Sequence, residues 1–153
     1  MFKKVLIAED FDSINIAVEQ TLKDLDVQEI QYAKYCDDAI LKFKKALQDK
    51  EPFDLLISDL SFEDDYREVK IPSGEMLIEA IKEIQPKINV IVYSVENKPY
   101  VIKSLFENQK INAFVHKGRH SISQLKTAIE TLLYGKTFIS PELDYALQDK
   151  TGK

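Results

Sequence analysis

The chain has 153 residues, of which 44% are hydrophobic and 31% are charged. This composition fits one folded domain with a sizeable core and excludes an intrinsically disordered chain. The formal net charge of −5 argues against a domain that itself grips nucleic acid, because that affinity comes largely from neutralised phosphates.

Short apolar runs alternate along the chain with longer stretches in which apolar residues recur at helical spacing, which predicts alternating strands and helices. The predicted strands lie around residues 5–8, 30–33, 53–57, 90–93 and 113–115, and the predicted helices around 14–25, 39–47, 76–84, 100–106 and 122–133. Because most of the runs are apolar throughout, we expect strands covered on both faces, as in a parallel sheet. Ser121 and Gln124 fit a capping box at the start of the last helix.

Five strand–helix pairs with right-handed crossovers predict a doubly wound α/β domain, with helices on both faces of the sheet. Gly135 would end the fifth helix. We therefore assign residues 1–134 to this domain and residues 135–153 to a linker or C-terminal tail. Such sheets bind ligands beyond the C-terminal ends of their strands, so the residues at those ends are the candidates for function.

Three acidic residues follow two of the predicted strands. Glu9 and Asp10 come after the first strand, and Asp59 comes after the third. In one crevice, each pair of these carboxylates would repel by about 4 kcal/mol at ~4 Å and an effective dielectric constant of roughly 20. A bound Mg²⁺ would resolve the conflict, because this ion prefers carboxylate, water and phosphate oxygens.

The last two strands end in residues that suit an anion. Ser94 ends the fourth strand and Lys117 follows the fifth. Alone, the serine would be read as a turn residue and the lysine as a surface residue. Together with the acids, Ser94 would donate a hydrogen bond and Lys117 would supply positive charge to an anion beside the metal. With Asp59 as nucleophile, the set fits phosphoryl transfer to an aspartate.

This order of residues resembles the response-regulator receiver family of two-component signalling, over about residues 3–133. The resemblance implies a flavodoxin-like fold of five strand–helix units with strand order 2-1-3-4-5. It implies that Asp59 is the phosphoacceptor, supplied by a sensor histidine kinase or by a phosphotransfer protein of a phosphorelay. Such a domain promotes its own phosphorylation and dephosphorylation but has no separate substrate, so we do not expect an enzyme.

The resemblance also implies a set of metal ligands. Asp10 and Asp59 would bind Mg²⁺ directly through their carboxylates. The backbone carbonyl of Ser61 would be the third ligand from the protein. Glu9 would bind the ion mostly through water.

A second set of residues would respond to the phosphoryl group. By the resemblance, Ser94 and Lys117 would bind it, and Phe114 would be an aromatic switch that swings inward. The surface of the fourth helix, fifth strand and fifth helix would then change shape. We expect the resulting output surface around Lys98, Tyr100 and Lys103.

Four features depart from the family pattern. The loop over residues 60–73 is longer than usual, and the next helix begins with Ser73 and Gly74 rather than with aspartate and glycine. Val95 stands where a smaller residue is usual, and we hypothesise that it shields the phosphoryl group. Gly118 replaces the proline that often follows the family's lysine.

The missing proline and the segment 135–143 resemble the LuxR-like transcription factors, in which a helix-turn-helix DNA-binding domain follows the receiver. The resemblance implies regulation of transcription, with DNA bound only through that absent output domain, and pairing of two receivers as a homodimer. We favour an excised receiver fragment over a stand-alone regulator.

The sequence predicts a cytoplasmic protein without a membrane partner. No apolar run approaches the ~20 residues that cross a bilayer. The apolar start of the chain stops at Glu9, too soon for an export sequence. Cys36 has no second cysteine to pair with, which fits a reducing compartment.

Two other functions remain open. A Mg²⁺-dependent nucleic-acid enzyme of the toprim kind also places acids after its strands, although its Asp-x-Asp motif is here Asp59-Leu60-Ser61. A receiver-like interaction module that never takes phosphate would fit the long loop. The glycine-rich motifs of P-loop and dinucleotide-binding proteins do not occur in the sequence.

Overall fold

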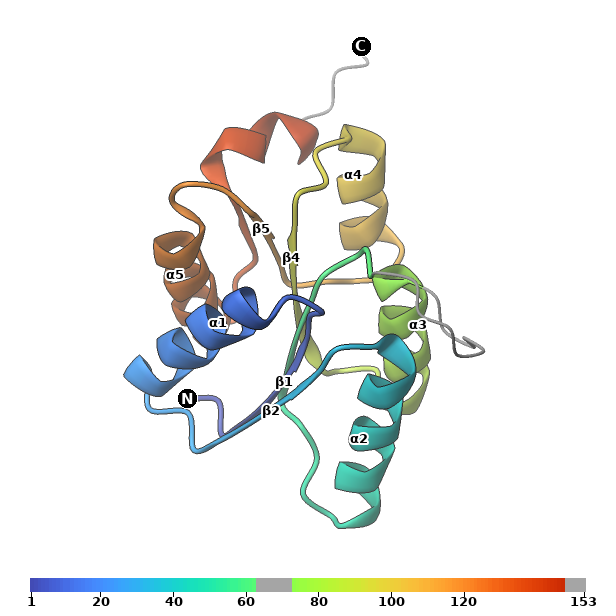
Figure 1. The fold of residues 1–153 in the computed structure, drawn as a ribbon. Helices are drawn as coiled ribbons and strands as arrows, with labels where there is room; N and C mark the ends of the chain where they lie inside the picture. Colours follow the sequence, from blue (N-terminus) through green and yellow to red (C-terminus); the bar gives the residue numbers. More distant parts are fainter. Residues whose placement is uncertain (63–72, 148–153) are drawn as a thin grey trace.

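A parallel β-sheet lies between two layers of helices in the computed structural model, which describes residues 1–62 and 73–147 (Figure 1). The strands are β1 (Lys4–Ala8), β2 (Glu29–Ala33), β3 (Leu55–Ser58), β4 (Asn89–Ser94), β5 (Ala113–His116) and β6 (Phe138–Ile139). The helices are α1 (Asp12–Asp24), α2 (Cys36–Gln48), α3 (Gly74–Ile84), α4 (Pro99–Glu107), α5 (Ser121–Leu133) and the 3₁₀ helix η1 (Pro141–Leu147).

The strand order is β2-β1-β3-β4-β5-β6, and every neighbouring pair is parallel. The predicted doubly wound α/β fold and the order of the first five strands are confirmed. The chain places β2 on one side of β1 and then crosses back to place β3 on the other side. The switch point therefore lies between β1 and β3. Ala8 pairs with Ser58 there, which brings the residues after both strands to one edge.

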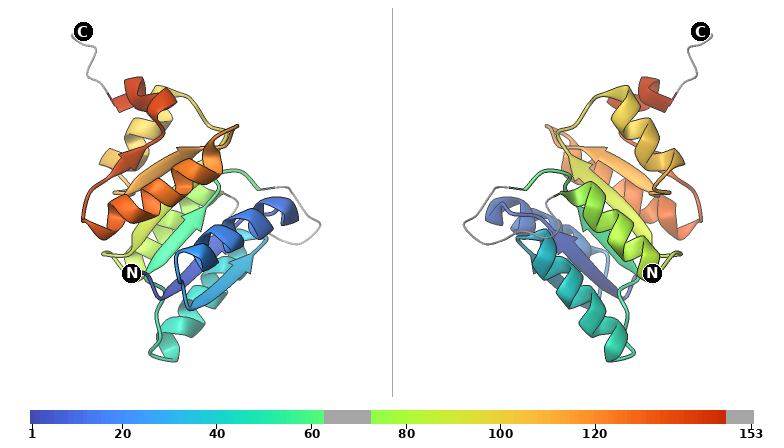
Figure 2. Two further views of the ribbon diagram at one scale, coloured as in Figure 1. Left: turned by 90° about the vertical axis from the view of Figure 1, so that its left-hand side faces the viewer. Right: turned by 90° about the vertical axis from the view of Figure 1, so that its right-hand side faces the viewer.

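Two apolar clusters hold the layers together. Helices α1 and α5 cover one face of the sheet, and α2, α3 and α4 cover the other (Figure 2). Alternate strand residues enter the two clusters because successive side chains point to opposite faces. Leu6, Leu56, Val92 and Phe114 belong to one cluster and Val5, Leu55, Ile57 and Tyr93 to the other. No helix among the described residues is long and apolar enough to cross a membrane.

Two local details differ from the prediction. The third strand begins at Leu55 rather than at residue 53. The carboxylate of Asp54 turns to the start of β1, where it accepts the backbone N–H groups of Lys3 and Lys4 at 2.8 and 3.1 Å. The capping box at the start of α5 is wrong: the helix has no side-chain cap, and the Ser121 hydroxyl bonds the hydroxyl of Tyr93 at 2.6 Å.

The sheet has six strands instead of five because part of the expected tail adds to it. Phe138 and Ile139 form β6 on the edge of β5, and η1 continues beside α4 (Figure 1). Leu143 and Ala146 of η1 are 4% and 3% exposed and join the apolar cluster beneath α4. We call residues 138–147 the C-terminal segment. It packs on the core formed by the first five strands, and the domain boundary predicted at residue 134 stays a prediction.

The lone cysteine is a buried residue at the start of α2. Cys36 is 3% exposed. Its burial, with the nearby acidic residues, raises the pKa of the thiol to about 12. The thiol therefore stays protonated and unreactive at neutral pH, as expected of a structural cysteine.

Helix α3 begins directly against the backbone after β3. The Ser73 side chain caps the helix by accepting the Met76 N–H at 3.2 Å, and the Gly74 N–H donates to the carbonyl of Leu60 at 3.0 Å. A Cβ atom at Gly74 would overlap the carbonyl oxygen of Asp59 and lie 2.8 Å from Leu60 Cα. Only glycine therefore allows this approach.

We predict that Gly74→Ala lowers the free energy of unfolding by about 1–3 kcal/mol, because the new methyl group forces backbone apart. Gly118→Ala is the matched control, since the nearest atom to a Cβ there is His116 Nδ1 at 4.0 Å. Urea unfolding of both variants checks this. Equal stability of the two variants would show that α3 does not press on the Asp59 backbone.

Candidate functional site

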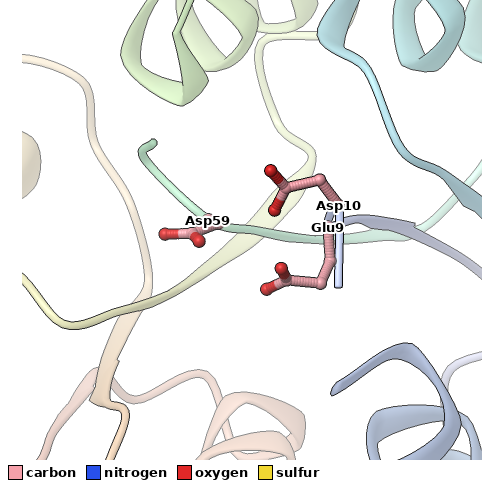
Figure 3. A group of neighbouring side chains, drawn as sticks. All are labelled: Glu9, Asp10 and Asp59. Carbon is pink, nitrogen blue, oxygen red and sulfur yellow. The ribbon is translucent and has the colours of Figure 1, made fainter. Parts of the chain in front are cut away.

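Three carboxylates meet at the C-terminal edge of the sheet. Glu9 and Asp10 follow β1 and Asp59 follows β3, at the level set by the pairing of Ala8 with Ser58. One oxygen of each carboxylate lies within 4.8 Å of the others. Figure 3 shows the side chains of Glu9 and Asp10 extending toward the side on which Asp59 lies. Glu9 and Asp59 are only 1% and 7% exposed. Carboxylate oxygens this close together can hold a metal ion.

Lys117 brings positive charge to this group. Its ammonium donates hydrogen bonds of 2.8 Å to Glu9 Oε1 and to Asp59 Oδ2. The ammonium lies over the Tyr93 ring, 5.6 Å from the ring centroid. The backbone N–H of Lys117 donates to the carbonyl of Ser94 at 2.8 Å. One ammonium therefore serves two nearly buried carboxylates, with Asp10 beside them.

Burial changes the proton affinities of the site. Desolvation raises the pKa of Glu9, with a smaller contribution from the Asp59 charge, and the bonds from Lys117 and Phe11 offset this only partly. Burial alone would lower the pKa of Lys117, but its hydrogen bonds to Asp59 and Glu9 and their charges together outweigh burial and raise it. The lysine thus stays charged at neutral pH, and the Glu9 carboxylate favours additional positive charge.

The backbone fixes one oxygen of Asp59. The Leu60 N–H donates to Asp59 Oδ1 at 2.6 Å, and the Ser61 N–H is 3.5 Å from the same oxygen. The other oxygen, Oδ2, faces Lys117. The two oxygens therefore have different surroundings, and Oδ2 is the one beside the ammonium.

A residue that the sequence analysis missed supports the acidic pair. The Asn15 side chain, 3% exposed, donates to the backbone carbonyl of Glu9 at 2.9 Å. The Phe11 N–H donates to Glu9 Oε2 at 3.1 Å. Asn15 lies among the apolar residues of α1, and a polar residue on that buried face was the one sign of its role.

Ser94 reaches the same edge but its hydroxyl faces the next loop. The side chain is 2% exposed, and its Oγ accepts the Glu96 N–H at 3.1 Å. Val95 is 68% exposed. The structure thus places Ser94 at the edge of the sheet where the carboxylates lie, and leaves the Val95 side chain exposed to solvent.

Phe114 is fully buried. Its side chain is 0% exposed and belongs to the cluster on the α4 side of the sheet. The ring is therefore already inside the core in this structure, and the expected inward swing would have no exposed position to start from.

At the expected output surface, Tyr100 is 72% exposed. Most of the long loop, residues 63–72, lies outside the described residues.

A doubly wound sheet in this order is the receiver-domain fold, and the acids, serine and lysine stand at its C-terminal edge. Solved structures of the response regulator RcsB share this fold. The isolated receiver domain of RcsB from Salmonella enterica serovar Typhimurium, with the phosphomimetic BeF3−, is 23% identical, with a TM-score of 0.75 over 95% of this chain and 99% of that chain.

Two further structures agree. The non-phosphorylated receiver domain of the stress response regulator RcsB from Escherichia coli is 25% identical, with a TM-score of 0.74 over 90% of this chain and 98% of that one. A longer RcsB chain from Salmonella typhimurium is 24% identical, with a TM-score of 0.80, and matches 97% of this chain and 70% of its own length. Other matching RcsB structures are described as DNA complexes, one with two RcsB dimers on two parallel DNAs. No protein-family model matches the sequence, and no curated protein matches it either.

We predict that Lys117→Met lowers the free energy of unfolding by about 3 kcal/mol without divalent cations, because two nearly buried carboxylates lose their counter-charge. A divalent cation should restore part of this loss by taking the place of the ammonium. Lys126→Met, on the exposed side of α5, should change the stability by less than about 0.5 kcal/mol. Urea unfolding with chelator and with cation checks this, and equal losses in the two variants would contradict it.

Proposed function

We propose that this chain is a phosphoacceptor receiver domain of a two-component response regulator and that Asp59 accepts the phosphoryl group. The observation that carries the proposal is the meeting of Glu9, Asp10 and Asp59 with the Lys117 ammonium, 2.8 Å from Asp59 Oδ2. A carboxylate nucleophile, acidic metal ligands and a fixed cation are what phosphoryl transfer to an aspartate requires.

Mg²⁺ fits the donor set, since the three carboxylates offer oxygens within 4.8 Å of one another. Asp10, Asp59 and the backbone carbonyl of Ser61 would hold the ion, and Glu9 would hold it through water. When bound, the ion supplies positive charge to the phosphoryl oxygens. The protein's own contribution is to keep the ligands together and largely out of water.

Asp59 Oδ2 is the attacking oxygen in this proposal, because it lies beside the Lys117 ammonium, which can shift to the phosphoryl oxygens, whereas Oδ1 is held by the backbone N–H of Leu60. It attacks the phosphorus of a phosphohistidine on a sensor kinase or phosphotransfer protein. The new P–O bond forms as the P–N bond breaks, and the electron pair returns to the imidazole. Lys117 then shares its hydrogen bonds with the phosphoryl oxygens. The domain in this way promotes its own phosphorylation and, with water as the attacking group, its dephosphorylation.

The added charge of about −1.5 to −2 provides the driving force for switching. Ser94 turns its hydroxyl toward a phosphoryl oxygen and away from its present place in the loop. A complete switch from 1:99 to 99:1 requires that phosphorylation favour the active state by about 5.5 kcal/mol. A few charge-assisted hydrogen bonds can supply this.

The output of the proposed switch is regulation of transcription. Structures of the similar RcsB are described as complexes with DNA, in one case as dimers. With a net charge of −5, this domain would act on DNA through a separate output domain and would pair with a second receiver. A cytoplasmic location follows from the proposed kinase partner.

We predict that the protein gains one phosphoryl group from acetyl phosphate with Mg²⁺, measured as intact mass, and that chelation prevents the gain. Asp59→Asn should gain none, because the attacking oxygen is lost. Asp54→Asn is the control, since Asp54 precedes β3 and binds the backbone of Lys3 and Lys4; it should be phosphorylated like the parent. No gain in the parent would favour the interaction module, and Mg²⁺-dependent nuclease or DNA-relaxing activity would favour the toprim-like enzyme.

A substitution of Val95 tests whether this side chain shields the phosphoryl group. If the side chain limits access of water, Val95→Ala should lose the phosphoryl group faster than the parent. The decay of the phosphorylated mass after removal of acetyl phosphate measures this rate. If the phosphoryl group is lost at the same rate in both proteins, the exposed Val95 side chain does not limit the access of water.

A further inference from the structure

The C-terminal segment, residues 138–147, is anchored on the strand that leads to Lys117. The N–H groups of Phe138 and Ser140 donate to the carbonyls of Asn112 and Phe114, both at 3.0 Å. Leu143 enters the same apolar cluster as the Phe114 ring. The segment thus covers the edge of β5 and, through η1, a face of α4.

Polar side chains tie this segment to β5 and α5. The Ser140 hydroxyl is fully buried, accepts the His116 N–H at 2.8 Å and donates to Gln124 Oε1. Gln124 Nε2 in turn donates to Glu142 at 2.9 Å. His116 Nδ1 lies 3.8 Å from Glu142 Oε2. Specific hydrogen bonds, and not only apolar contacts, therefore fix the position of the segment.

The same segment reaches the loop that follows Ser94. We define the β4–α4 loop as residues 95–98. The Tyr145 hydroxyl donates to the carbonyl of Asn97 at 3.2 Å. The ring of His116, whose backbone binds the segment, lies 3.2 Å from the carbonyl of Val95. Two carbonyls of this short loop thus contact the C-terminal segment or the residue that seats it.

The same loop also contacts Ser94, the proposed switch residue. The Glu96 N–H donates to Ser94 Oγ. When the Ser94 hydroxyl turns toward a phosphoryl oxygen, the Glu96 N–H must follow it or lose this bond. If the N–H follows, the carbonyls of Val95 and Asn97 move with it, and the bond from Tyr145 to Asn97 is strained or broken.

We propose that the C-terminal segment is a strap that fastens the β4–α4 loop in the unphosphorylated conformation, so that docking of the strap and phosphorylation of Asp59 oppose each other. The inference rests on the proposed function. Phosphorylation loosens the strap and uncovers the edge of β5 and the adjoining face of α4. By linkage, loosening the strap favours phosphorylation by the same factor.

Hydrogen exchange read by mass spectrometry tests the first half. In parent protein whose intact mass shows the phosphoryl group, amides of residues 138–147 should exchange at least about 5-fold faster than in the unmodified protein, the lower end of usual coupling factors. Asp59→Asn with the same reagents should show no change. Unchanged exchange in a phosphorylated parent overturns the strap while the proposed function stands.

A second variant tests the fastening without phosphorylation. Tyr145→Phe removes only the hydroxyl that bonds Asn97, so the amides of residues 96–98 should exchange faster than in the parent. Tyr134→Phe is the matched control, because Tyr134 is 82% exposed at the end of α5. If the two variants exchange alike, the strap is overturned. If Tyr145→Phe alone loosens the loop while the parent takes no phosphoryl group, the fastening is supported and the proposed function fails.

Discussion

One electrostatic requirement underlies the structure: acidic side chains that have lost most of their water need positive charge at the same edge of the sheet. Glu9 and Asp59 are almost wholly buried, and a single ammonium, that of Lys117, bonds both. Asp10 brings a third carboxylate to the same place. Burial raises the pKa of Glu9, so a cation beside its carboxylate is favoured, and the lysine can be shared with an incoming anion.

The fold meets this requirement through backbone geometry more than through side-chain choice. The parallel register sets the ends of β1 and β3 level, and α3 approaches so closely that Gly74 has no room for a side chain. On the far side of Ser94, the β4–α4 loop extends from the acidic site to the C-terminal segment. The site and the segment are therefore joined by four residues, which is a short route for transmitting a change in charge.

Much of the fold and site could be predicted because strand ends are visible as changes from apolar to polar residues. The residues predicted in this way at the edge of the sheet are Glu9, Asp10, Asp59, Ser94 and Lys117. Three features could not be predicted, since each depends on a distant partner. Asn15 binds a backbone carbonyl that only folding brings near. Ser121 bonds Tyr93 instead of capping its helix. Strand β6 has two residues, too few for a periodic pattern, and forms because β5 offers a free edge.

Because the site residues are far apart along the chain, the site can form only after most of the domain has folded. Lys117 lies 108 residues after Glu9 and 58 after Asp59. Any piece that ends before the fifth strand contains the aspartate without its ammonium and without the strand that places it. Nascent or half-unfolded copies that lack the fifth strand therefore cannot assemble the group formed by Glu9, Asp59 and Lys117.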